Sequence, residues 1–141
     1  MIRNSMPGYP LSRMRRNRQS NWSRRLVCEN HLSRSDLILP VFVMEGKNKT
    51  EPIESLPNVN RYTIDRIVDI AMECEDNGIP LIAIFPVIDV SLKSDYAEEA
   101  YRSSNLVCRT VSAIKNKASN IGIMTDVALD PYTTHGHDGI M

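Results

Sequence analysis

The sequence has few cysteines and no long apolar run, and both shortages limit the class of protein. Cys28, Cys74 and Cys108 lie far apart, form no Cys-X-X-Cys pair and are odd in number. We therefore expect no disulfide framework and a reducing compartment, the cytoplasm. No apolar stretch approaches the ~20 residues that a membrane helix needs, and none follows the N-terminal arginines as in a secretory signal. A membrane partner is therefore not expected.

Familiar catalytic signatures are also missing. No glycine-rich phosphate loop follows an apolar run, so a Rossmann or P-loop protein lacks its fingerprint. No serine lies in a Gly-X-Ser-X-Gly motif, and no cysteine lies at the carboxyl end of a predicted strand. Schiff-base chemistry needs a lysine in a desolvated setting. The five lysines all lie in predicted loops or on helix surfaces: Lys47, Lys49, Lys93, Lys115 and Lys117.

Charge is balanced over the whole chain but not along it. Seventeen basic residues accompany seventeen acidic ones, yet seven arginines precede the first acid, Glu29. Removing those seven leaves ten basic against seventeen acidic residues, a formal charge of −7 for residues 26–141. The basic charge of this protein is thus concentrated in its first part.

That first part is expected to be an extended arm over residues 1–33, ahead of a folded part over residues 34–141. Residues 1–25 are rich in Ser, Asn and Arg, contain helix breakers, and cannot bury enough apolar surface to fold alone. The arginines could contact nucleic acid or a membrane, or the arm could pack on a partner subunit. Aromatic residues between the arginines are scarce, so we do not expect a nucleic-acid partner.

Three apolar runs, at 37–43, 80–87 and 121–125, predict buried strands. Pro40 lacks a ladder donor and predicts a bulge or an edge within the first of them. Residues 45–57 are expected to form a polar loop.

Two amphipathic segments between these runs predict helices. Residues 63–77 carry apolar side chains at helical spacing, with Thr63 as N-cap and Gly78 after the last turn. A second helix is expected to begin after Ser104 or Asn105. Its apolar stripe comprises Val107, Val111, Ile114 and Ala118.

Alternating strands and helices imply a parallel sheet with right-handed crossovers. The strand starts are spaced by about forty residues, which is ordinary for a (β/α)8 barrel with long loops. Three strands cannot close a barrel, and an open three-stranded sheet leaves two apolar edges, which proteins avoid. We therefore expect part of an α/β barrel whose edges are covered by further strands or by partners.

A dense set of polar residues follows the third predicted strand. Asp126 stands at its end, where a carboxylate can bind a substrate amine or orient a catalytic group, or can serve as a cap or loop ion pair. His135, His137 and Asp138 could hold a metal ion, or the histidines could hydrogen-bond within the loop. Asp130 and Asp138 could converge across the turn between them, and two carboxylates with water suit magnesium better than zinc.

Residues 126–139, DVALDPYTTHGHDG, closely resemble the metal-switch segment of porphobilinogen synthases, also called 5-aminolevulinate dehydratases. Residues 37–43, 51–57, 78–80 and 85–89 resemble the same family in the same order. The resemblance implies a homo-oligomeric TIM barrel, a hexamer or octamer, whose N-terminal arm embraces a neighbouring subunit. It also implies condensation of two 5-aminolevulinate molecules to porphobilinogen in heme and other tetrapyrrole biosynthesis.

The resemblance also implies which site residues are present. Members of the family with catalytic zinc carry three cysteines where this sequence has Ala128, Asp130 and Asp138, so it resembles the aspartate-rich, magnesium-using variant. Asp126 corresponds to an active-site aspartate, and His137 to a position that binds an accessory metal in some relatives. We therefore expect Asp126 to be catalytic and Asp130, His137 and Asp138 to be metal ligands.

The two Schiff-base lysines of the family correspond to strands beyond residue 141. We therefore expect this chain to hold the arm and about the first three strands of the barrel, and to be inactive by itself. Two alternatives remain. The chain could be a truncated product that exchanges its arm or strands with full-length subunits. It could also be a metal-dependent hydrolase that binds its metal through His135 and His137.

Overall fold

The computed structural model describes residues 7–139 and 141 and divides into two units, with the division between Leu32 and Ser33. The expected boundary was one residue later.

The first unit contains helices where an extended arm was expected. A 3₁₀ helix, η1 (Arg16–Arg18), precedes a short α-helix, α1 (Asn21–Leu26). Proline and glycine occur only before residue 11, so they do not interrupt this stretch, and arginine is a good helix former. The expectation of an extended conformation is therefore wrong for this segment. Only Ser23 is buried in the described part of the unit, so it has no apolar core of its own.

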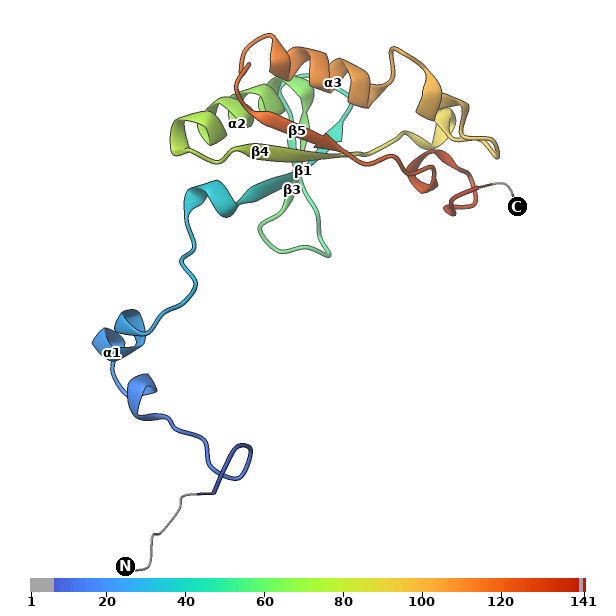
Figure 1. The fold of residues 1–141 in the computed structure, drawn as a ribbon. Helices are drawn as coiled ribbons and strands as arrows, with labels where there is room; N and C mark the ends of the chain where they lie inside the picture. Colours follow the sequence, from blue (N-terminus) through green and yellow to red (C-terminus); the bar gives the residue numbers. More distant parts are fainter. Residues whose placement is uncertain (1–6, 140) are drawn as a thin grey trace, which may run out of the picture. The chain divides into compact units, whose positions relative to one another are not determined.

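The second unit is built on a five-stranded sheet (Figure 1). The three predicted strands are confirmed as β1 (Ile38–Met44), β4 (Leu81–Pro86) and β5 (Gly122–Thr125), and they run parallel. Two short strands were not predicted: β2 (Thr50–Pro52), which lies in the expected polar loop, and β3 (Asn60–Thr63).

The sheet order is β2-β3-β1-β4-β5, with β3 parallel to β1 and β2 antiparallel to β3. The expectation of two uncovered apolar edges is therefore wrong for the β1 side, because β3 and β2 continue the sheet there. In the described part of the chain no strand pairs with the outer edge of β5.

Pro40 lies in an uninterrupted ladder. β1 and β4 pair without a bulge from Ile38 and Leu81 to Val43 and Pro86. β3 pairs with β1 only from Phe42 onward, so Pro40 has a strand neighbour on one side. A missing backbone donor is tolerated at such a local edge.

Both predicted helices are confirmed and cover the same face of the sheet (Figure 1). α2 (Ile64–Asn77) follows Thr63 and ends at Gly78, whose φ of 72° is the left-handed conformation that glycine adopts easily. α3 (Leu106–Lys115) begins after Asn105, whose side chain accepts a hydrogen bond from the Cys108 amide at 2.8 Å.

Between these helices and the sheet lies the core. Alternate residues of the strands point toward the helices and are buried. The core comprises Val41, Val43, Ile82, Ile84 and Ile121 from the sheet side, and Ile67, Ala71, Cys74, Leu106, Ile114 and Ala118 from the helix side. The opposite sheet face carries Ile38 and Met124, which are half-exposed. In a closed barrel that face points into the interior.

Candidate functional site

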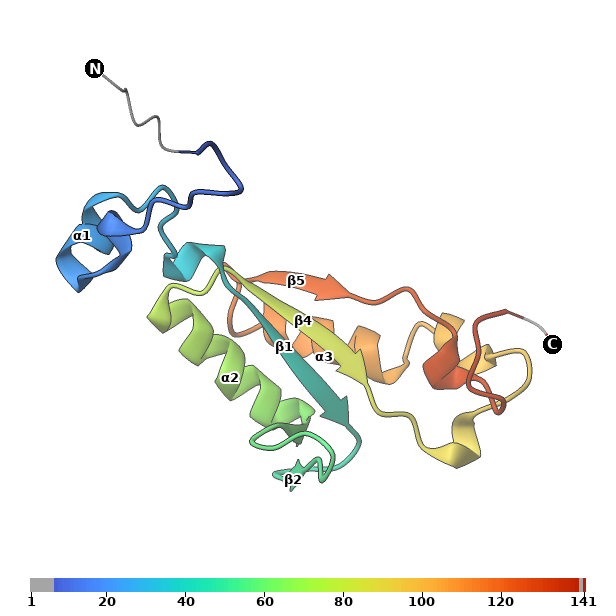
Figure 2. The same ribbon diagram turned by 90° about the horizontal axis from the view of Figure 1, so that it is seen from below.

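Two loops lie side by side at the carboxyl edge of the sheet (Figure 2). One follows β4 and contains η3 (Val90–Leu92) and η4 (Glu98–Tyr101), and the other follows β5. Ser94 and Thr133 form a parallel bridge between the loops, supported by hydrogen bonds of 3.1 and 3.2 Å. The carboxyl edge of a parallel sheet is where α/β proteins bind their ligands, so this pair of loops is the candidate site.

The loop after β5 is organised by Asp138. Its Oδ1 accepts hydrogen bonds from the backbone amides of Leu129 and Asp130, at 2.6 and 3.1 Å, at the start of η5 (Asp130–Tyr132). The hydroxyl of the buried Thr133 donates to the carbonyl of His137 at 3.0 Å. Asp130 and Asp138 are thus brought together, through the backbone amide of Asp130 and one carboxylate oxygen of Asp138.

The two histidines interact with each other. The His137 amide donates to Nδ1 of His135 at 3.3 Å, and the rings stack with centroids 6.1 Å apart. An Nδ1 that accepts leaves the proton of a neutral imidazole on Nε2. That Nε2 is buried and has no hydrogen-bond partner in the described part of the chain. The histidines therefore hydrogen-bond within the loop, one of the two alternatives expected for them.

The described residues do not form a metal centre in this arrangement. Among residues 7–139 and 141, no three His, Cys, Asp or Glu side chains lie close enough together to hold one ion. One oxygen of Asp138 is already used by two backbone amides. The arrangement thus does not fit a metal ion held by Asp130, His137 and Asp138 alone, and no chemical step is derived through one.

Asp126 is placed differently from Asp138. It is exposed, immediately follows β5, and lines a cavity of about 300 Å³ together with Tyr101, Cys108 and Tyr132. Its carboxylate makes no hydrogen bond or ion pair to any other described residue, so it is neither a cap nor half of a loop salt bridge there. A free carboxylate at the carboxyl edge of a sheet can bind a protonated amine or accept a proton.

Tyr132 is a site residue to which the sequence gave no role. It is buried and lines the same cavity as Asp126. Burial, followed by the negative potentials of Cys108 and Glu99, raises the pKa of the Tyr132 phenol. The phenol therefore stays protonated and can donate a hydrogen bond at neutral pH. Only its position between the predicted strand and the histidines could have drawn attention to it.

Replacing Asp138 with alanine should loosen the loop after β5 without unfolding the sheet. Two exposed amides lose their acceptor, and a lost cap of this kind costs about 1–2 kcal/mol. We expect hydrogen exchange at the amides of Leu129 and Asp130 to accelerate about tenfold or more, measured by NMR. Asp138→Asn keeps an acceptor oxygen and should restore most of the protection. Unchanged exchange in Asp138→Ala would contradict the capping role.

The fold and the site together define the class of protein. A mainly parallel sheet, with two helices on one face and polar loops at its carboxyl edge, is part of a TIM-type α/β barrel. The sequence model of the delta-aminolevulinic acid dehydratase family matches residues 11–141. The chain belongs to this family, as its resemblance indicated.

Individual relatives agree with this assignment. The chain is 48% identical over 129 residues to the delta-aminolevulinic acid dehydratase of Bradyrhizobium diazoefficiens, covering 92% of this chain and 36% of the relative. It is 41% identical to the Chlamydia pneumoniae enzyme, covering 91% of this chain and 39% of the relative.

A solved structure has the same fold over the shared part. It is the porphobilinogen synthase of Toxoplasma gondii in complex with the reaction product porphobilinogen. The TM-score is 0.83 at 38% identity, covering 92% of this chain and 37% of that one. The chain thus spans less than half the length of the relatives it matches.

Proposed function

We propose that the chain supplies the first βα units of a 5-aminolevulinate dehydratase, which joins two 5-aminolevulinate molecules to form porphobilinogen. The observation that carries the proposal is the free carboxylate of Asp126 at the carboxyl end of β5, within the most family-like segment of the sequence. The names of the relatives and the product bound to the Toxoplasma protein support the same reaction.

The chain's own residues would contribute binding and orientation. Asp126 would pair with the protonated amine of a substrate, and the Tyr132 phenol would donate a hydrogen bond beside it. Lys115 cannot take part at this edge, because its Nζ donates to the Ile121 carbonyl at 2.5 Å, just before β5 begins. The amines that form Schiff bases would therefore come from the remaining part of the barrel.

Two further properties belong to this proposal. Magnesium would be the metal used, since Ala128, Asp130 and Asp138 offer no thiolate for zinc. The compartment would be the reducing cytoplasm, because the three cysteines are free thiols. None of the helices that the structure describes is long and apolar enough to cross a membrane.

A chimera tests the proposed activity. We would replace the corresponding segment of the Bradyrhizobium relative with this chain and measure porphobilinogen formation from 5-aminolevulinate. The chimera should be active, and the 141-residue chain alone should form no product. A folded but inactive chimera would contradict the proposal, and so would product formed by the chain alone.

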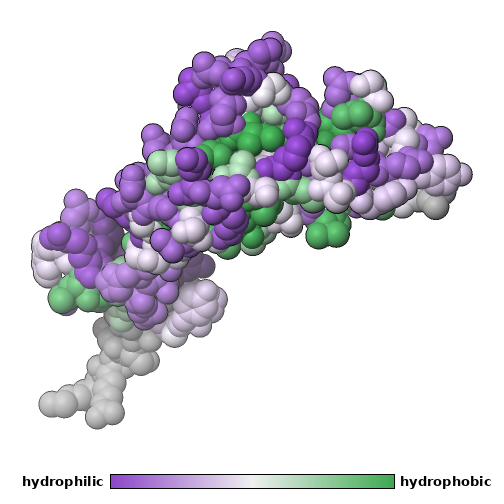
Figure 3. Space-filling model, turned by 90° about the horizontal axis from the view of Figure 1, so that it is seen from above, coloured by the Kyte–Doolittle hydropathy of each residue, from purple (hydrophilic) through white to green (hydrophobic). Residues whose placement is uncertain are grey.

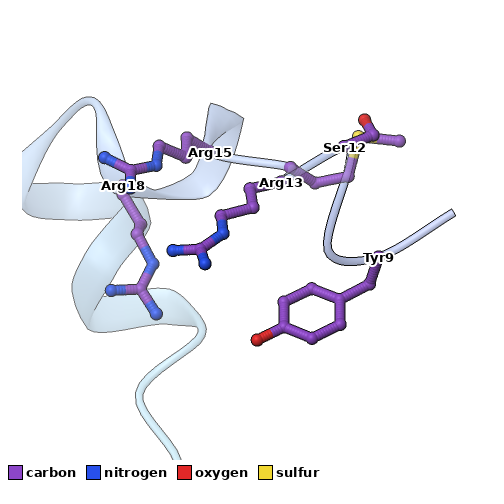
Figure 4. A pocket seen from close by; sticks show the side chains of 6 residues that line it. Tyr9, Ser12, Arg13, Arg15 and Arg18 are labelled. Atoms are coloured by element: carbon purple, nitrogen blue, oxygen red, sulfur yellow. The ribbon is translucent and has the colours of Figure 1, made fainter. Parts of the chain in front are cut away.

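We also propose that the first unit binds a second copy of the chain. It carries seven arginines and one acid, whereas the second unit carries ten basic and sixteen acidic residues. The guanidinium of Arg13 lies 5.7 Å from the ring centre of Tyr9, with Arg15 and Arg18 beside a cavity of about 530 Å³ (Figure 4).

Apolar surface adds to this argument. The space-filling view shows apolar areas between hydrophilic ones on the face it presents (Figure 3). In the first unit Leu11, Trp22 and Leu26 are each more than 60% exposed, which is unusual for side chains without a partner. Opposite charge and exposed apolar residues together favour an arm that packs on another subunit.

Charge reversal in the arm tests this assembly. Replacing Arg13, Arg15 and Arg18 with glutamate should weaken self-association at least tenfold, measured by sedimentation equilibrium at ~50 mM salt, and added salt should weaken the unaltered chain too. Replacing Lys47, Lys49 and Lys117 in the same way is the control. An unaltered chain that stays monomeric at all concentrations would contradict the proposal. Capture of full-length dehydratase subunits alone would favour the interaction-module alternative.

A further inference from the structure

A second cavity of about 290 Å³ lies at the carboxyl edge of the sheet, away from Asp126. Arg61 of β3 and Lys93, which follows η3, are the two charged residues of its lining. The remaining lining residues are apolar and come from β1, from the loop between β2 and β3, from the end of β4 and from Pro131. Elements that are distant in sequence thus build one pocket with two cations over apolar walls.

The strand register explains why Arg61 lies in this pocket. Arg61 is the partner of Phe42 in the parallel pairing of β1 and β3. Partners in a ladder project to the same face, and Val41 and Val43, which flank Phe42, point to the helix side. Arg61 and Phe42 therefore occupy the face that the helices leave uncovered.

Neither cation has a counterion in the described part of the chain. Arg61 and Lys93 are half-buried and take part in none of the ion pairs there. Glu51 is the partner of Arg61 across β2 and β3, yet the two form no ion pair. A half-buried cation beside apolar side chains is stabilised by an anion that enters the pocket.

We propose that this cavity binds a small aliphatic carboxylate. The carboxylate would pair with Arg61 and Lys93, and its hydrocarbon part would contact Phe42, Ile53 and Leu56. A volume near the lower limit of ligand pockets favours a short organic acid over a larger ligand. The basic first unit of a second copy is a poor occupant, because its charge has the same sign. The proposal does not depend on the dehydratase activity.

Binding to the purified 141-residue chain tests the proposal by NMR titration. Sodium butanoate is the probe, butanamide is its uncharged counterpart, and acetate carries the same charge on a shorter chain. Butanoate should shift the amide signals of Phe42, Arg61 and Lys93 and bind at least tenfold more tightly than butanamide. Acetate should bind more weakly than butanoate, because the apolar walls contact less hydrocarbon.

Variants identify the cations. Arg61→Gln and Lys93→Gln should each raise the Kd for butanoate about tenfold, the loss of one charge-assisted contact. Lys117→Gln, an exposed lysine at the end of α3, should change it less than twofold. Lys93 lies in a loop, so Lys93→Gln keeps the test decisive if Arg61→Gln does not fold, which circular dichroism reports.

Three results would overturn the proposal. Equal binding of butanoate and butanamide would remove the charge requirement. Equal binding of butanoate, acetate and inorganic phosphate would leave only a nonspecific attraction for anions. Shifts confined to an added Glu-rich peptide, with none from butanoate, would make the pocket a contact for an acidic protein segment instead.

Discussion

Ile82→Ala should lower the free energy of unfolding of the second unit by about 2–5 kcal/mol. Ile82 lies in the middle of β4, has no solvent exposure, and belongs to the cluster between the sheet and the two helices. Removing three carbon atoms loses their transfer free energy and leaves a cavity that strands paired on both sides cannot fill. A loss of this size is a large fraction of the stability of an ordinary domain.

Urea unfolding followed by circular dichroism measures the effect, and Ile38→Ala is the matched control. Ile38 is also an isoleucine of a central strand, but it is 50% exposed on the face without helices. Its truncation should cost about 1 kcal/mol or less. If the two variants lost equal stability, the described core would not be the one that holds the sheet together.

The main strands and helices could be predicted because their residues repeat at the right intervals. Continuous apolar runs predicted β1, β4 and β5, and the spacing in residues 63–77 predicted α2 together with its terminal Gly78. β2 and β3 escaped prediction because they are three and four residues long and mostly polar. Short strands at the edge of a sheet are held by their neighbours' backbone, which no local pattern records.

Within the site, the sequence identified the right segment but could not assign roles inside it. A carboxylate at position 138 suits a metal ion and a backbone cap equally well, and only the positions of the amides of Leu129 and Asp130 decide between them. Lys93 was read as a loop lysine, because its neighbour across the cavity, Arg61, lies 32 positions earlier in the chain. Long-range placement of this kind depends on strand order, which composition and spacing leave open.

Asp126 and Asp138 show how the same side chain takes different roles in one loop. Asp138 spends its carboxylate on the backbone and holds the loop in shape. Asp126 makes no such contact among the described residues and lines a cavity. A carboxylate that contributes nothing to its own loop is available to a ligand, and that contrast distinguishes the residue that should affect turnover from the one that should affect order.

Asp126→Asn in the active chimera should therefore reduce porphobilinogen formation at least a hundredfold. Asparagine keeps the size of the side chain and its exposed position but removes the negative charge that would pair with a substrate amine or accept a proton. Because Asp126 makes no hydrogen bond to other described residues, the substitution should leave the urea midpoint within about 0.3 M of the parent chimera.

Asp69→Asn is the matched control for this measurement. Asp69 is an exposed carboxylate of α2, remote from the carboxyl edge, and pairs with Arg66 at 3.7 Å on the helix surface. An exposed pair of this kind contributes little, so turnover should stay within about twofold of the parent. If Asp126→Asn retained full turnover while the chimera remained folded, the carboxylate would not act on the substrate. Asp126 would then be a loop residue, and the Tyr132 cavity would have to find another role.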